Sequence, residues 1–367
     1  MKALWIGGCL LGLAIQPSPW TQDSRLDPVS MDSELWERSS AQGELLEHLG
    51  RQAYLMRAGM LWLSEADLQE GTIEFDIAFG GERGFVGAAF HIQDRSNYEH
   101  VYLRPHQSGQ PDACQYTPVI NGLSAWQLYG SSSAAIHYEP ERWTRVRIDF
   151  WGAGVYLAVD SNEPQMVAQI RGNEQDMSQS NGVGLTVAGG FAPAYFSNFR
   201  YGPLETAPSA AVNGKGDALP GVVASWSVSS AIPESSVNQV LELPADLLDD
   251  LEWLSIEADP SGITNLAKRQ GIAGGKNTCF ARLALPSDQQ QLKRFALGFS
   301  DTSRVYLNRR LIFTGKDGYR TRDHRFLGSI GLFDELVLSL QPGENELLIA
   351  VSEGFGGWGL MGQFPGD

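Results

Sequence analysis

In the stretch NYEHVYLRPHQSG, residues 97–109, every second residue from 98 to 104 has a side chain with both an apolar part and a hydrogen-bonding group. These residues are Tyr98, His100, Tyr102 and Arg104. Because successive side chains of a strand point to opposite faces, these four share one face, while Val101 and Leu103 share the other. Tyrosine rings can cover apolar C–H surface, and Arg and His can give directional hydrogen bonds to hydroxyl groups. The pattern therefore predicts a groove for a polyhydroxylated ligand such as a glycan.

More polar and aromatic residues follow within reach of the same groove. They are Gln115, Tyr116, Trp126 and Tyr129. A second interpretation stays open, since Tyr and His side chains on a sheet face commonly pack against a loop or a neighbouring domain. Partial exposure on a concave sheet would favour the ligand groove, and burial of Tyr102 would favour the structural role.

The sequence offers no motif for a metal, a cofactor or a catalytic triad. Cysteines and histidines do not cluster at zinc-like spacing, no G-x-S-x-G elbow is present, and structural calcium has no supporting motif. Cys114 and Cys279 are too far apart to suggest a disulfide framework. We therefore expect no catalytic residue, no metal ligand and no cofactor.

Period-two alternation recurs along most of the chain and predicts the elements that position these residues. In GTIEFDIAF, Ile73 and Phe75 point one way while Glu74 and Asp76 point the other, and similar runs follow on both sides of residue 200. The stretch 202–221 is rich in Ala, Gly and Pro and predicts a linker. The expected fold is all-β, with two tandem antiparallel β-sandwiches (jelly rolls) over residues 33–201 and 222–367.

One polar loop of the second domain, GKDGYRTRDHRFLG at residues 315–328, is dense in opposite charges. Since such charges can satisfy one another, we expect this loop to support the interface between the domains. Binding of an acidic sugar or a cation is the alternative.

The N-terminus and the overall charge bear on location and partners. One Lys, an apolar run from Ala3 to Ile15 and a Pro/Ser segment predict a signal peptide over residues 1–20, too short to span a membrane. We therefore expect a secreted or periplasmic protein without a membrane span. The formal net charge of −16 argues against nucleic acid as a partner.

The first domain resembles the concanavalin A-like lectin/glucanase superfamily, and in particular the bacterial domains classed as 3-keto-disaccharide hydrolases. The likeness rests on G-x-I-E-F-D at 71–76, on the strand at 85–90 and on F-S-N-F-R at 196–200, although His91 stands where Arg is usual. DTSRVYLNRRLIF and LQPGENELLIAVSEGFGGWG in the second domain resemble a galactose-binding-domain-like jelly roll. In lectin-like and glucanase-like sandwiches, sugars bind the concave outer face.

The glucanase resemblance also sets a test for catalysis. Glucanases of this fold carry their carboxyl pair on one strand as Glu-x-Asp-x-x-Glu, whereas here Ala78 and Phe79 stand where the second glutamate belongs. We therefore expect Glu74 and Asp76 to be solvated charges. The resemblance implies an exported, non-catalytic carbohydrate-binding protein, with a sugar-degrading hydrolase or a structural or adhesive module as alternatives.

Overall fold

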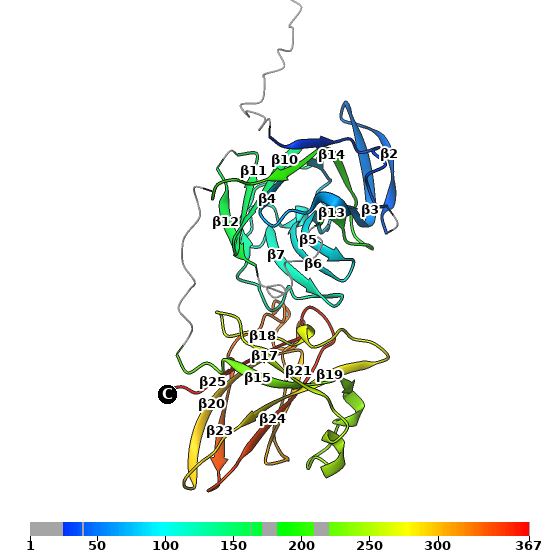
Figure 1. Ribbon diagram of the computed structural model, residues 1–367. Helices are drawn as coiled ribbons and strands as arrows, with labels where there is room; N and C mark the ends of the chain where they lie inside the picture. The colour runs from blue at the N-terminus through cyan, green and yellow to red at the C-terminus, as the bar shows by residue number, and fades with distance from the viewer. Residues whose placement is uncertain (1–24, 39, 162, 171–181, 209–219, 367) are drawn as a thin grey trace, which may run out of the picture.

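Two lobes built almost wholly of antiparallel strands make up the protein (Figure 1). The computed structural model describes residues 25–38, 40–161, 163–170, 182–208 and 220–366. Helix within these ranges is confined to short 3-10 turns. No described helix is long and apolar enough to cross a membrane. The predicted all-β, antiparallel fold class is confirmed.

The first lobe is a single 14-stranded sheet that curls on itself. Its elements are β1 (Asp27–Val29), β2 (Gln42–His48), β3 (Arg51–Leu63), η1 (Ser64–Ala66), β4 (Gly71–Ala78), β5 (Val86–Asp94), β6 (Asn97–Leu103), η2 (Pro105–Gln107), β7 (Cys114–Ile120), β8 (Leu123–Ser124), β9 (Ser133–Ala134), β10 (Thr144–Trp151), β11 (Gly154–Val159), β12 (Gln165–Gln169), β13 (Gly182–Val187) and β14 (Ala194–Pro203).

The long strand β3 joins the two halves of this sheet. Residues 54–56 pair with β14, and residues 59–63 pair with β13. Gly59, the first residue of the second run, has φ +92°, and a Cβ there would meet the carbonyl oxygen of Ser40 at 1.8 Å. We call β12-β11-β10-β4-β14 the upper half-sheet and β13-β5-β6-β7-β8 the lower half-sheet, as they lie in Figure 1.

The core of the first lobe lies between the inner faces of these half-sheets. In β4, Ile73, Phe75 and Ile77 are buried in it, so Glu74 and Asp76 face outward. In β6, Val101 and Leu103 are buried in the same core, as the alternation predicted. The outward faces of β4 and β6 therefore carry the polar residues that the sequence analysis singled out.

The second lobe is a sandwich of a larger sheet, β17-β15-β19-β24-β21-β22, and a smaller one, β18-β25-β20-β23. Its elements are β15 (Ser225–Ser229), β16 (Ile232–Pro233), η4 (Glu234–Ser236), η5 (Ala245–Leu248), β17 (Trp253–Glu257), β18 (Thr264–Asn265), η6 (Leu266–Lys268), β19 (Lys276–Ala284), β20 (Gln291–Ser300), β21 (Thr302–Leu307), β22 (Arg310–Lys316), β23 (Asp334–Leu340), β24 (Glu346–Ser352) and β25 (Gly359–Gln363). Its main core surrounds the buried Trp226 and Trp358.

Residues 123–130, which begin at β8, dock the first lobe on the second. The fully buried Gln127 donates its N–H to the carbonyl of Gly356 and its Nε2–H to that of Leu327. Its carbonyl accepts from the N–H of Ile330, and its Oε1 accepts from the Ser300 hydroxyl. Four hydrogen bonds therefore bind one side chain and its backbone to the second lobe. Leu327 belongs to the polar loop 315–328, which takes the predicted place at this interface.

An apolar cluster surrounds these hydrogen bonds. Its members from both lobes are Ala125, Leu128, Tyr129, Ile263 and Met361, with Ile330 and Leu332 packed against them. Beneath the cluster, the N–H groups of Gly354 and Phe355 donate to the carboxylate of Asp301. Glu353 is 4% exposed, and burial together with nearby Asp301 raises its pKa to about 8.

The raised pKa of Glu353 predicts that the protein loses stability as pH rises. The folded state holds the proton up to about pH 8, whereas the unfolded chain releases it near 4.5. Between these values the wild-type free energy of unfolding should fall by about 1.4 kcal/mol per pH unit more than that of Glu353→Gln. Urea unfolding of both full-length proteins across this range measures the difference; parallel curves would contradict the prediction.

Candidate functional site

The predicted stripe of β6 lies on the outer face of the lower half-sheet, where Tyr102 is buried and Tyr98, His100 and Arg104 are half-buried. His100 Nε2 lies 2.7 Å from the Thr186 hydroxyl of β13, and burial lowers the pKa of His100 to about 4. The Tyr102 hydroxyl donates to Gln115 Oε1 at 2.7 Å, and only 7% of Tyr102 is exposed. Burial also raises the pKa of Tyr98 to about 12. Tyr98 is the more open of the two tyrosines.

The other predicted groove residues divide among three places. Tyr116 faces the core and donates its hydroxyl to Glu99 at 2.6 Å. Trp126 and Tyr129 lie in the segment that docks on the second lobe, and the Trp126 carbonyl accepts from Gln115 Nε2. Arg104 forms an ion pair with Asp112.

Partial exposure, expected for Tyr98, His100, Tyr102 and Arg104, is wrong for Tyr102, which is buried. The physical reason is that its hydroxyl bonds to Gln115, which is itself buried. Tyr116 and Tyr129 are buried as well. A role for the eight residues in ligand binding stays a prediction.

A polar pocket opens on the outer face of the upper half-sheet. Its volume is about 550 Å³, within the range of roughly 300–1,000 Å³ usual for small-ligand sites. We call it the polar pocket; its polar lining consists of Arg51, Gln52, Glu74, Asp76, Arg145, Ser197, Asn198 and Arg200, and residues 28–31 complete its wall.

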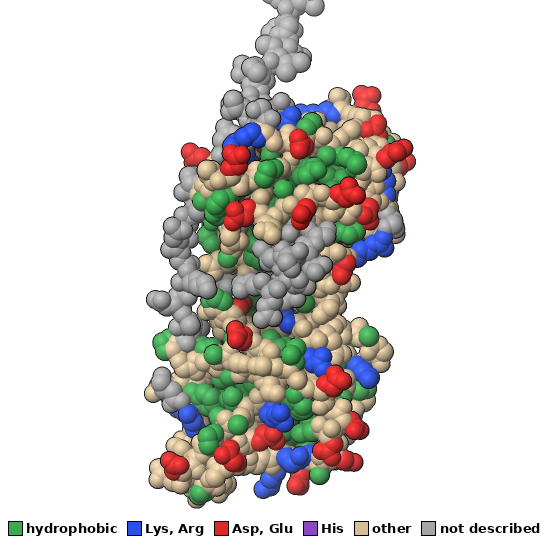
Figure 2. Space-filling model, in the orientation of Figure 1, with side chains coloured by type: hydrophobic (Ala, Val, Ile, Leu, Met, Phe, Trp, Pro, Cys, Tyr) green, Lys and Arg blue, Asp and Glu red, His purple; other side chains and the backbone are tan. Residues whose placement is uncertain are grey.

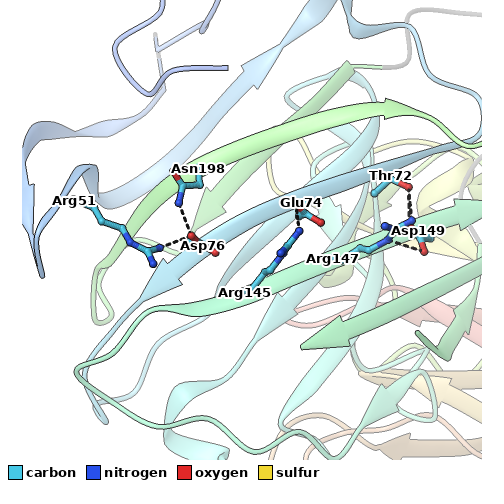
Figure 3. Close-up of polar contacts among 8 residues, drawn as sticks. All are labelled: Arg51, Thr72, Glu74, Asp76, Arg145, Arg147, Asp149 and Asn198. Atoms are coloured by element: carbon cyan, nitrogen blue, oxygen red, sulfur yellow. Dashed lines mark hydrogen bonds and ion pairs between the residues drawn. The ribbon is translucent and has the colours of Figure 1, made fainter. Parts of the chain in front are cut away.

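An irregularity in β14 shapes this pocket. The pairing of β14 with β4 shifts register between Ser197 and Arg200, and Asn198 adopts φ +51° there. Before the shift β14 pairs with β3, and after it β14 pairs with β1. The exchange of partner strands coincides with the pocket, and Asn198 points toward Asp76 (Figure 3).

Two ion pairs fix the carboxylates of the polar pocket (Figure 3). Asp76 accepts hydrogen bonds from Arg51 and, at 2.6 Å, from Asn198 Nδ2. Arg145 lies 2.5 Å from Glu74 Oε1. Burial raises the pKa of Asp76, against the opposing effect of these partners. Glu74 is only 4% exposed, so the interpretation of Glu74 as a solvated charge is wrong.

Polar and aromatic groups border the polar pocket. The Arg147 guanidinium and the Thr72 hydroxyl donate to the buried Asp149 farther along the same face. At the other end, the Arg51 guanidinium lies 5.3 Å from the ring centre of Trp143. The site therefore combines hydrogen-bond donors, acceptors and one nearby aromatic surface. The described residues contain no group of three or more His, Cys, Asp or Glu side chains placed to hold a metal.

Comparisons with known proteins find solved structures that match part of this chain at low identity. No protein-family model and no curated protein matches the sequence. A carbohydrate binding module CBM66 from Bacillus subtilis is 16% identical, with TM-score 0.32 over 46% of this chain and 95% of the module. The VIP36 exoplasmic/lumenal domain is 15% identical, with TM-score 0.33 over 48% of this chain and 85% of that domain.

A third similar structure is a xylan beta-1,4-xylosidase from Bacillus halodurans C-125. It is 13% identical with TM-score 0.32, and the match spans 52% of this chain but 41% of the xylosidase. Likeness at these levels says nothing of the ligand, so function must be derived from the side chains of this chain.

The hydrogen bonds of the stripe predict unequal roles for its two tyrosines. Tyr102→Phe removes the donor to the buried Gln115, so the free energy of unfolding should fall by about 1–3 kcal/mol. Tyr98→Phe is the matched control, because its hydroxyl has no hydrogen bond within the part of the chain that the structure describes; its effect should stay within about 0.5 kcal/mol. Urea unfolding of the full-length variants measures both. Equal effects would show that Tyr102 does not stabilise the sheet through this bond.

Proposed function

We propose that this protein is a non-catalytic carbohydrate-binding protein whose ligand occupies the polar pocket. The observation that carries the proposal is the pocket itself, where carboxylate acceptors and guanidinium and amide donors alternate around about 550 Å³. Sugar hydroxyls both donate and accept hydrogen bonds, so a lining of both kinds complements them. Trp143 beside Arg51 supplies an apolar surface that suits the C–H face of a pyranose.

The polar pocket suits this role better than the stripe of β6. His100 and Tyr102 already have partners in Thr186 and Gln115, so their hydrogen-bonding groups are engaged without a ligand. The carboxylates of the polar pocket are paired as well, but they line an open volume of about 550 Å³ that a ligand can enter, whereas Tyr102 is buried. We therefore assign the stripe a structural role in the proposal. Export remains part of the proposal through the signal peptide predicted for residues 1–20, which lie outside the described residues.

A sugar hydrolase is the second candidate, because Glu74 and Asp76 are two carboxyl groups on one strand face within one pocket. The raised pKa of Asp76 suits a general acid, and the Arg145 partner of Glu74 suits an ionised base or nucleophile. Binding without turnover is favoured because each carboxyl group is held in an ion pair, Asp76 with Arg51 and Glu74 with Arg145.

Substitution of Asp76 tests the proposed function. A panel of immobilised mono- and oligosaccharides identifies a ligand, and calorimetry then measures its affinity. Asp76→Asn should weaken binding about tenfold or more, because one charge-assisted acceptor is lost. Glu335→Gln, which removes an exposed carboxylate paired with Arg294 in the second lobe, is the control and should leave affinity unchanged.

A reducing-sugar assay on the same proteins separates the two candidates. Release of reducing ends by the wild type, lost about 10²–10⁴-fold in Asp76→Asn, would establish the hydrolase. Unchanged affinity of Asp76→Asn for every bound sugar would exclude the polar pocket as the binding site.

A further inference from the structure

One guanidinium in the polar pocket lacks the partner that the others have. Arg200 lines the pocket from β14, and its Nη1 is buried without a hydrogen-bond partner among the described residues. Arg51 is paired with Asp76 and Arg145 with Glu74, but Arg200 forms no such ion pair within those residues. Nη1 itself is closed to solvent, but Arg200 as a whole is only half-buried, so a ligand in the pocket can meet the accessible part of this side chain.

The carboxylate that stands opposite Arg200 in the sheet does not form an ion pair with it. Arg200 stands directly opposite Glu74 in the pairing of β14 with β4. Glu74 Oε1, however, lies 2.5 Å from Arg145, on the other side of β4. The lining thus holds three guanidinium groups against two carboxylates, Glu74 and Asp76, and Arg200 supplies the excess positive charge.

The surroundings limit how much negative charge a ligand can carry. The chain has a formal net charge of −16, and Figure 2 shows acidic side chains spread over the visible face of both lobes. The electrostatic potential of these acidic groups would repel a polyanion. A ligand with one negative group could still gain binding free energy from direct contact with a guanidinium. Guanidinium binds the two oxygens of a carboxylate or a sulfate in a fork-shaped arrangement.

We propose that the polar pocket selects a sugar unit bearing a single anionic group, and that Arg200 binds that group. The ligand class is a uronic acid or a sugar monosulfate, which share two or more oxygens around one negative charge. This inference rests on the proposed function, since it assumes that a sugar occupies the pocket. It adds Arg200 as the residue that determines specificity.

Matched sugars with and without charge test the inference. The probes are methyl galactoside, methyl galacturonide and methyl galactoside 6-sulfate, and the corresponding set built on glucose, each titrated by calorimetry into the full-length protein. At least one anionic sugar should bind about tenfold or more tighter than its neutral counterpart. A preference for the uronide or for the sulfate identifies which source of the anion the pocket takes.

Variants of Arg200 assign the preference to this side chain. Arg200→Gln should abolish the preference for the anionic sugar and leave the affinity for the neutral sugar within about threefold. Arg200→Lys keeps the positive charge but loses the paired N–H donors of the guanidinium. Its preference for the anionic sugar should therefore be reduced but not abolished. Arg57→Gln, an exposed guanidinium paired with Glu44, is the control and should behave as the wild type. Circular dichroism checks that each variant is folded.

The outcomes separate this inference from the proposed function. Equal binding of neutral and anionic sugars by the wild type, or a preference that survives in Arg200→Gln, overturns the inference and leaves carbohydrate binding intact. If no sugar in either set or in the immobilised panel binds, the proposed function fails and the inference fails with it. If Arg200→Gln does not fold, the result for Arg200→Lys decides: an undiminished preference overturns the inference.

Discussion

A strand can bury only one of its two faces in the core of a sandwich, and this constraint places the polar pocket. Because β4 buries Ile73, Phe75 and Ile77, it must turn Glu74 and Asp76 outward. The register of β10 then sets Arg145 beside Asp76 and Arg147 beside Glu74. Carboxylates that lose water in this way need cationic partners, so the charged face follows from core packing together with strand register.

The core also explains the irregularity in β14. Phe196 and Phe199 are both buried in the core, although their spacing of three residues would place them on opposite faces of a regular strand. The shifted register restores Phe199 to the core and moves Asn198 out toward Asp76. Asn tolerates the positive φ that this requires better than most residues do. The pocket therefore lies where the strand accommodates its two phenylalanines.

Local alternation allowed the sequence to predict which face each strand buries, but not what covers the opposite face. The buried sides of β4 and β6 were predicted correctly for this reason. Glu74 was misjudged because its partner Arg145 is brought near by strand register, which no local pattern contains. Likewise, Gln127 meets Ser300 and Leu327 only after two lobes have folded and docked. Burial of Tyr129 at that junction was outside the reach of a strand pattern.

The state of the polar groups distinguishes the two outward faces of the first lobe. On the lower half-sheet, hydrogen bonds run from Tyr102 through Gln115 to the backbone of Trp126, the neighbour of Gln127. That face is thus continuous with the junction, and a ligand there would compete with bonds that join the lobes. The polar pocket lies on the half-sheet away from the second lobe (Figure 1), and Arg200 in its lining forms no ion pair with another described residue. Occupation of the polar pocket by a ligand would therefore leave the hydrogen bonds of the junction undisturbed.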